Sequence, residues 1–140
     1  SWTAGVAQTG RNRSINREKL DRAALEQEIA DPVSLRRRVL VGYTYLLRQR
    51  AAHPAFHPAG GQELLLEDPA FFALRRTSPD GGETVLCLHN VTVEPRRFWL
   101  GPNGKGGNLV DLISGRRFLP TSDGGVTLLA YQALWLAPFP

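Results

Sequence analysis

The chemically most capable side chains near the N-terminus are three arginines. Arg11, Arg13 and Arg17 flank Ser14-Ile15-Asn16 in a stretch with little periodicity, and we expect residues 1–14 to form a loop ahead of a helix. A guanidinium group offers a planar fork of donors suited to carboxylate, phosphate or sugar hydroxyls. A loop that carries such groups beside a helix suits the rim of an active site. On residue types alone, a solvent-exposed basic loop is the simpler interpretation.

A cysteine and a histidine stand two residues apart in a predicted strand. Cys87 and His89 would therefore point to the same face of a sheet, as a nucleophile and its base would. The alternative, which we favour, is a small buried apolar cysteine beside a surface histidine.

Two further histidines lie four residues apart, at the spacing of helical metal ligands. Pro54 and Pro58 interrupt any helix that would align His53 with His57. A tight turn between a helix and a sheet, with Phe56 as its buried plug, is the favoured interpretation. The sequence also lacks phosphate-loop, nucleophile-elbow and zinc-protease motifs, so we expect no catalytic residue, cofactor or metal site in this chain.

Asn90-Val91-Thr92 matches an N-glycosylation acceptor, but we expect Asn90 to end a strand through side-chain hydrogen bonds. Three aromatic residues, Trp99, Tyr131 and Trp135, could form a platform for stacking sugars. At strand spacing they are expected instead in the core of the sheet.

Helical periodicity is confined to the first part of the chain. Leu20–Ala30 and Pro32–Ala52 carry apolar residues every three or four positions. Asp31-Pro32 supplies an N-cap and a first helical residue, and His53-Pro54 closes the second helix.

The remainder has the period of β-strands separated by turn residues. Short strands with tight connections predict an antiparallel meander or sandwich, because parallel pairing would need longer crossovers. The predicted strands are Glu63–Leu66, Phe71–Arg76, Thr84–His89, Arg97–Leu100, Leu109–Ile113, Arg116–Leu119, Val126–Leu129 and Ala133–Leu136.

Composition limits the class of protein. The 140 residues are 42% hydrophobic and 21% charged, typical of a globular domain, and one cysteine excludes an internal disulfide framework. No apolar run approaches the roughly 20 residues of a membrane span.

Residues 1–58 hold 10 basic and 5 acidic groups, but the aromatics do not interleave with the arginines, so we expect no nucleic-acid partner. The sequence begins with serine, and its helical part has an apolar stripe that one small sheet would cover only in part. These features predict a fragment of a larger protein. The missing signal peptide predicts that this protein is cytoplasmic.

Several motifs together resemble one enzyme family. The block Gly10-Arg11-Asn12-Arg13-Ser14-Ile15-Asn16-Arg17, followed by Asp31-Pro32 and His53-Pro54-Ala55-Phe56, resembles the C-terminal part of sucrose-phosphorylase-like enzymes of glycoside hydrolase family 13, in the α-amylase superfamily. Three later stretches are similar to the terminal antiparallel domain C of that superfamily: Val85–Thr92, Asp111–Gly115 and Tyr131–Leu136.

The resemblance implies an α+β fragment. Residues 1–58 would be the C-terminal end of a (β/α)8 barrel, with residues 1–17 as the loop after the eighth strand and Pro32–Ala52 as the last barrel helix. Residues 59–140 would be the antiparallel β domain C, and the fragment would pack on the missing barrel. Active sites of such barrels lie in the loops at the C-terminal ends of the strands.

The resemblance also implies an activity for the parent enzyme. Family members are retaining α-glucoside phosphorylases or transglucosidases, in which inorganic phosphate intercepts a glucosyl-enzyme. Their reactive carboxylates lie upstream of Ser1, so the fragment alone would be inactive.

One arginine of the loop is implied to bind substrate. Arg13 matches the family arginine that closes the glucose subsite, while Asn16 and Arg17 would brace the loop. Because Arg11-Asn12 are two extra residues relative to the family pattern, Arg11 stays an alternative. The competing hypothesis is a stand-alone β-sandwich module that binds carbohydrate or acts as an adaptor.

Overall fold

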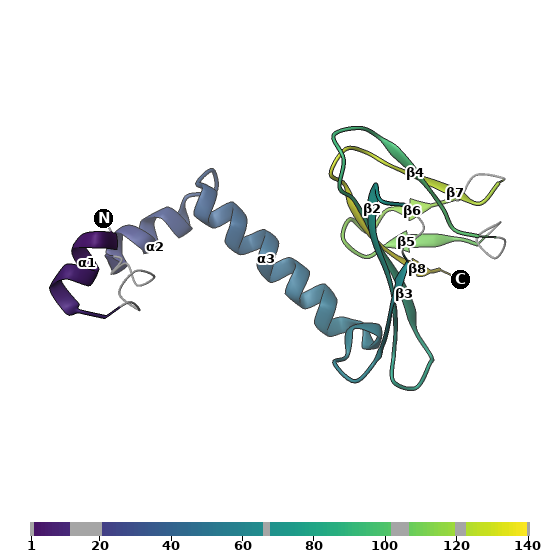
Figure 1. Cartoon of the computed structure of the whole chain (residues 1–140), viewed down its shortest axis with the longest axis horizontal. Coiled ribbons are helices and arrows are strands. Elements are labelled where there is room, and N and C mark those ends of the chain that lie inside the picture. The colour runs from purple at the N-terminus through teal and green to yellow at the C-terminus, as the bar shows by residue number, and fades with distance from the viewer. Residues whose placement is uncertain (1, 12–20, 66–67, 102–106, 120–122, 140) are drawn as a thin grey trace. The chain divides into compact units, whose positions relative to one another are not determined.

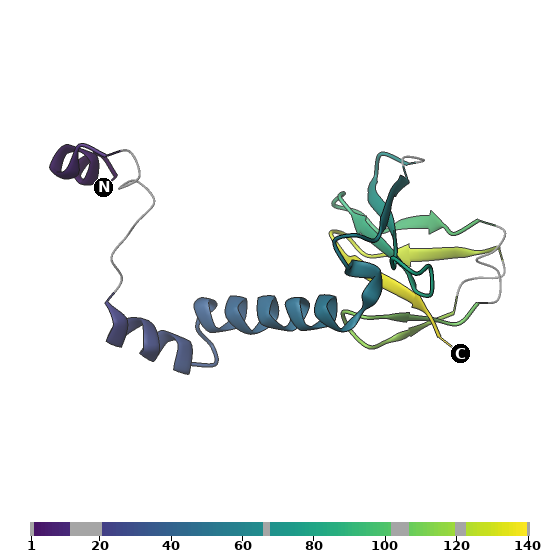
Figure 2. The ribbon, with the colours of Figure 1, turned by 90° about the horizontal axis from the view of Figure 1, so that it is seen from below.

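The computed structural model describes residues 2–11, 21–65, 68–101, 107–119 and 123–139. They form two compact units, residues 1–44 and residues 45–140. Helices occupy the first part of the chain and strands the second, as Figures 1 and 2 show. The predicted order, helices followed by an antiparallel β module, is confirmed.

The first unit begins with a helix that the sequence did not predict. Helix α1 spans Trp2–Thr9, within the stretch expected to be a loop, so that expectation was wrong. Gly10 ends the helix in a left-handed conformation, with φ of 63° and its N–H donating to the carbonyl of Val6 at 2.7 Å. Glycine adopts this conformation without a steric penalty, which makes it a common helix terminator.

Helix α2 spans Arg22–Ala30, close to the predicted range, and the Asp21 carboxylate caps it by accepting from the N–H of Ala24 at 2.8 Å. Helix α3 spans Leu35–Ala52 rather than starting at Pro32. Ser34 takes the capping role expected of Asp31, since its Oγ accepts from the N–H of Arg37 at 3.1 Å. Asp31 instead accepts from the N–H of Val33 at 3.0 Å, within the turn that joins the two helices.

The end of α3 lies at the predicted proline. His53 follows the helix in an extended conformation, and Pro54–Phe56 form the 3-10 helix η2. Ala55 and Phe56 are buried, which confirms Phe56 as the plug between helix and sheet. Among the described residues, no helix has the length and apolarity needed to cross a bilayer.

All eight predicted strands are present, with bounds shifted by up to two residues. They form a six-stranded sheet of order β1-β2-β3-β8-β5-β6 and a two-stranded sheet of β4 and β7, antiparallel at every pairing. The strands are β1 (Gly61–Leu65), β2 (Phe71–Thr77), β3 (Thr84–Asn90), β4 (Arg96–Trp99), β5 (Leu109–Asp111), β6 (Arg117–Phe118), β7 (Gly125–Leu128) and β8 (Ala133–Pro138).

The six-stranded sheet buries apolar side chains on both faces. On one face, Leu88 and Leu134 pack with Phe98 and Leu128 from the two-stranded sheet. On the other, residues of β3 and β8 pack against Ala55 and Phe56 of η2, and we call this the η2 face. Alternate residues of β3 contribute to opposite faces because the side chains of a strand alternate.

Two of the three aromatics expected in the core lie outside it. Trp99 is 55% exposed and Tyr131 is 67% exposed, so their predicted burial was wrong. Trp99 ends β4, and Tyr131 occupies a turn with φ of 54°, where strand alternation does not apply. Trp135 packs on Phe56 with ring centroids 4.8 Å apart.

Asn90 fulfils its predicted role at the end of β3. It is 2% exposed, and its amide group donates to the carbonyls of Glu94 and Leu129 at 2.7 and 2.8 Å. Its Oδ1 accepts from the N–H and the hydroxyl of Thr92. The residue therefore ties a turn together.

Candidate functional site

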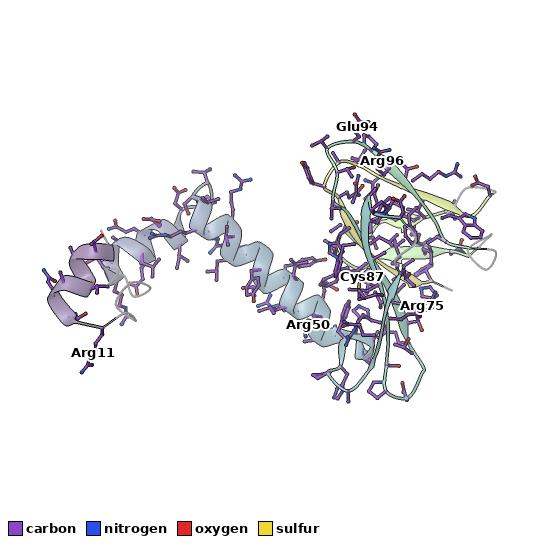
Figure 3. The ribbon with its side chains drawn as sticks, viewed as in Figure 1. Arg11, Arg50, Arg75, Cys87, Glu94 and Arg96 are labelled. Carbon is purple, nitrogen blue, oxygen red and sulfur yellow. The ribbon has the colours of Figure 1, made fainter. Side chains whose placement is uncertain are left out.

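The arginine loop is described only at its start. Arg11 follows the Gly10 terminator of α1, and its backbone N–H donates to Thr9 Oγ1 at 3.3 Å. Its side chain is exposed and extends away from the helix (Figure 3). Arg13, Asn16 and Arg17 lie outside the described residues. The roles of Arg11 and Arg13 at a glucose subsite therefore stay predictions.

Cys87 and His89 do share a face of the sheet, as their spacing predicted. Both line a pocket of about 250 Å³ on the η2 face. Burial raises the pKa of the Cys87 thiol to about 11, and the Arg76 guanidinium, which lowers this pKa, offsets burial only in part. At neutral pH the thiol therefore stays protonated, and the protonated form is the weaker nucleophile. Cys87 is buried, as the favoured interpretation predicted.

The imidazole of His89 adds no positive charge that would favour ionisation of the Cys87 thiol. Burial lowers the pKa of His89, which keeps the ring neutral. The His89 ring contacts the ring of Phe72, and the two ring centroids are 5.8 Å apart. The buried position of Cys87 agrees with the interpretation favoured from the sequence, whereas His89 is half-buried rather than on the surface.

The other two histidines have separate structural partners. His53 Nδ1 lies 2.6 Å from Glu83 Oε1, while His57 Nδ1 accepts from the N–H of Ala59 at 3.1 Å. No group of three or more potential metal ligands occurs among the residues that the structure describes.

The structure brings two arginines together on the η2 face, which no sequence motif predicted. Arg50, near the end of α3, and Arg76 of β2 line the same pocket as Cys87, together with the rings of Phe56 and Trp135. Figure 3 shows Arg50 on the last turns of α3 and Cys87 on β3. Arg50 and Arg76 are 26 positions apart, so only the β1–β2 register and the turn at η2 bring them together. No local sequence pattern predicts that these two arginines lie close together.

The first unit carries an apolar groove of about 430 Å³. Its walls come from α2 and the first turns of α3, and Arg36 is the one charged residue among the described residues that line it. Val39 is 60% exposed and Tyr43 is 62% exposed, so the apolar stripe predicted for this helix faces outward. The apolar lining residues are Leu25, Ile29, Leu35, Val39, Leu40 and Tyr43.

Two relatives match almost the whole chain. A glucosylglycerate phosphorylase of Spirochaeta thermophila is 39% identical over 150 aligned residues, covering 99% of this chain and 25% of that protein. A glucosylglycerate phosphorylase of Allomeiothermus silvanus is 38% identical over 134 residues, and the alignment covers 95% of this chain and 21% of that protein. The chain thus spans a quarter or less of the length of these relatives.

Solved structures share the fold. An α-amylase of Anoxybacillus superposes with a TM-score of 0.62 at 24% sequence identity. The superposition covers 74% of this chain and 23% of the α-amylase chain. No family model matches the chain. Sequence motifs, relatives and fold agree, and the chain is homologous to the C-terminal part of the sucrose-phosphorylase-like enzymes of glycoside hydrolase family 13.

Proposed function

We propose that this chain is the C-terminal part of a retaining α-glucoside phosphorylase that acts on glucosylglycerate and inorganic phosphate. The observation that carries the proposal is the 39% identity to a glucosylglycerate phosphorylase along 99% of the chain. The chain covers 25% of that relative, which leaves room for a separate catalytic body. We keep the cytoplasm as its proposed location.

Within that enzyme, residues 1–58 would end the catalytic (β/α)8 barrel and residues 59–140 would form domain C. The exposed groove of α2 and α3 supports this division, because an apolar surface of that kind gains stability when a protein surface covers it. The preceding barrel would supply the cover. The β unit has its own core between the two sheets and would serve a structural role.

The proposed reaction is a double displacement with net retention. A carboxylate of the barrel attacks the anomeric carbon and forms a glucosyl ester, while a second carboxyl group protonates the leaving glycerate oxygen. An oxygen of inorganic phosphate then attacks the same carbon, which breaks the ester, releases the carboxylate and gives α-glucose 1-phosphate. No acidic residue of this chain is assigned to these steps.

The contribution of this chain would be an arginine at the sugar subsite. Arg13 is the primary candidate and Arg11 the alternative, as their position in the motif implies. A guanidinium group there would donate hydrogen bonds to sugar hydroxyls or hold an aspartate that does so. The exposure of Arg11 at the end of α1 is compatible with a loop that reaches an active site.

The test is carried out on the longer reading frame that contains this chain. Arg13→Ala is expected to reduce kcat/KM for phosphorolysis of glucosylglycerate by about a hundredfold or more, as loss of a charged transition-state contact does. The control is Arg22→Ala, since the ion pair that Arg22 makes with Glu26 lies on the exposed surface of α2. Equal melting temperatures would exclude misfolding.

Other outcomes would change the assignment. A loss of activity in Arg11→Ala with a normal Arg13→Ala enzyme would move the subsite role to Arg11. A longer protein that cleaves no α-glucoside with phosphate would overturn the proposed function. The competing interpretation, a carbohydrate-binding or adaptor module, rests on the exposed rings of Trp99 and Tyr131, which lie on different segments.

A further inference from the structure

The η2 face of the six-stranded sheet is only partly covered. Phe56 and Ala55 pack over Val85 and Cys87, while the pocket beside them stays open to solvent. Its walls combine two aromatic rings with polar groups, and no acidic residue is among its described lining residues. The lining residues are Arg50, Phe56, Gln62, Leu74, Arg76, Cys87, His89 and Trp135.

Arg76 is held rigidly in this pocket by neutral partners. Its guanidinium donates to the carbonyls of Ala55 and His57 at 3.2 and 3.0 Å, and to Gln62 Oε1 at 2.6 Å. Gln62 is its neighbour across the β1–β2 pairing. These contacts orient the positive charge without neutralising it.

Arg50 adds a second positive charge and makes no hydrogen bond or ion pair with the described residues. Arg50 and Arg76 line the same pocket, where their like charges repel each other. A carboxylate between them would remove this repulsion and accept charge-assisted hydrogen bonds from both. A guanidinium that is already oriented loses less entropy on forming such a bond.

We infer that this pocket receives the carboxylate of an aspartate or glutamate from the part of the enzyme that precedes this chain, an inference that rests on the proposed function. Two observations favour this occupant over a free anion. The relatives are about four times as long as the chain, so a large protein body is available. The half-buried ring of Trp135 would stay wet around a small ion, whereas a docked protein segment would cover it.

Arg50 is the residue to change, because nothing in the described chain depends on its side chain. In the longer reading frame, Arg50→Gln is expected to lower the melting temperature of the C-terminal transition by about 2 °C or more. In the isolated 140-residue chain the same change is expected to have no effect. Arg48→Gln, another exposed arginine of α3 that does not line the pocket, is the matched control and is expected to be neutral in both proteins.

Arg50→Lys keeps the charge and is expected to recover at least half of the shift. If Arg50→Gln and Arg48→Gln behave alike in a longer protein that still phosphorolyses glucosylglycerate, the inference is overturned while the proposed function stands. Stabilisation of the longer protein by inorganic phosphate that disappears in Arg50→Gln would show an open pocket and would also overturn it. So would dimerisation of the isolated chain that depends on Arg50.

Discussion

Single polar side chains hold the turns of the β unit. Asn90 bridges the ends of β3 and β7, and the buried Asp111 organises the turn after β5 by accepting from the N–H groups of Ile113, Ser114 and Trp135. A buried side chain with several partners is costly to remove, because each partner is left without a hydrogen bond.

Replacement of Asn90 tests this cost directly. Asn90→Ala is expected to lower the free energy of unfolding by about 2–4 kcal/mol, since the carbonyls of Glu94 and Leu129 and the N–H of Thr92 all lose their partner. Urea denaturation of the chain measures it. Asn108→Ala is the control, because Asn108 is exposed and the contact recorded for it is made by its backbone carbonyl. Equal midpoints for the two variants would contradict the prediction.

At this scale the sequence predicted some roles and not others. Asn90 was placed correctly because an Asn-x-Thr after a strand can bond its own turn, a local property. The exposure of Trp99 and Tyr131 was missed. Trp99 lies on the outer face of β4, next to the buried Phe98, and Tyr131 lies in a turn. The proximity of Arg50 to Arg76 was also missed, since it arises only from tertiary structure.

The junction between helix α3 and the sheet is held by several specific contacts. Glu83, just before β3, accepts from the N–H of Ala55 at 2.8 Å and contacts His53 Nδ1 at 2.6 Å. One carboxylate therefore contacts both His53, the residue between α3 and η2, and Ala55 within η2. Phe56 can then remain in its buried position against Trp135.

Loss of this carboxylate should loosen the junction. Glu83→Gln is expected to lower the free energy of unfolding by about 1–2 kcal/mol, because the charge-assisted contact with His53 becomes a neutral one. Glu63→Gln is the control, as Glu63 pairs with Arg75 on the exposed face, where an ion pair contributes little. Urea denaturation compares the two, and an equal effect would argue that Glu83 is also a surface contact.

Elements were predicted well where a local signal existed. Alternating strands and turn residues gave all eight strands, and His53-Pro54 gave the end of α3. Helix α1 was missed because Trp2–Thr9 shows no amphipathic period, and only the conformation of Gly10 defines its end. The start of α3 moved from Pro32 to Leu35 because Ser34 competes successfully with Asp31 as a cap.

The β unit of the molecule has its own core, whereas none of the described residues of the helical unit, residues 1–44, is buried. The described residues of α2 and α3 include no buried residue, and the groove between them is lined almost wholly by apolar groups. A helix that exposes its apolar stripe gains its stability from a partner surface. The sequence predicted this stripe from its period, but its exposure was visible only in the structure.

The isolated chain is therefore expected to self-associate. Sedimentation velocity should show a mass that rises with protein concentration, because groove surfaces of two chains can cover each other. Val39→Glu places a charge on the groove and is expected to shift the chain toward the monomer. Val33→Glu is the control, since Val33 is exposed but does not line the groove. A monomer at every concentration would contradict the prediction.

The single cysteine gives the chain a practical property. Cys87 is only 3% exposed, and its high pKa keeps it in the unreactive thiol form at neutral pH. A cysteine introduced at an exposed helix position such as Arg48 would thus react with a maleimide dye far faster than the native one. Site-specific fluorophores can be attached to this protein with its own sulfur atom left in place.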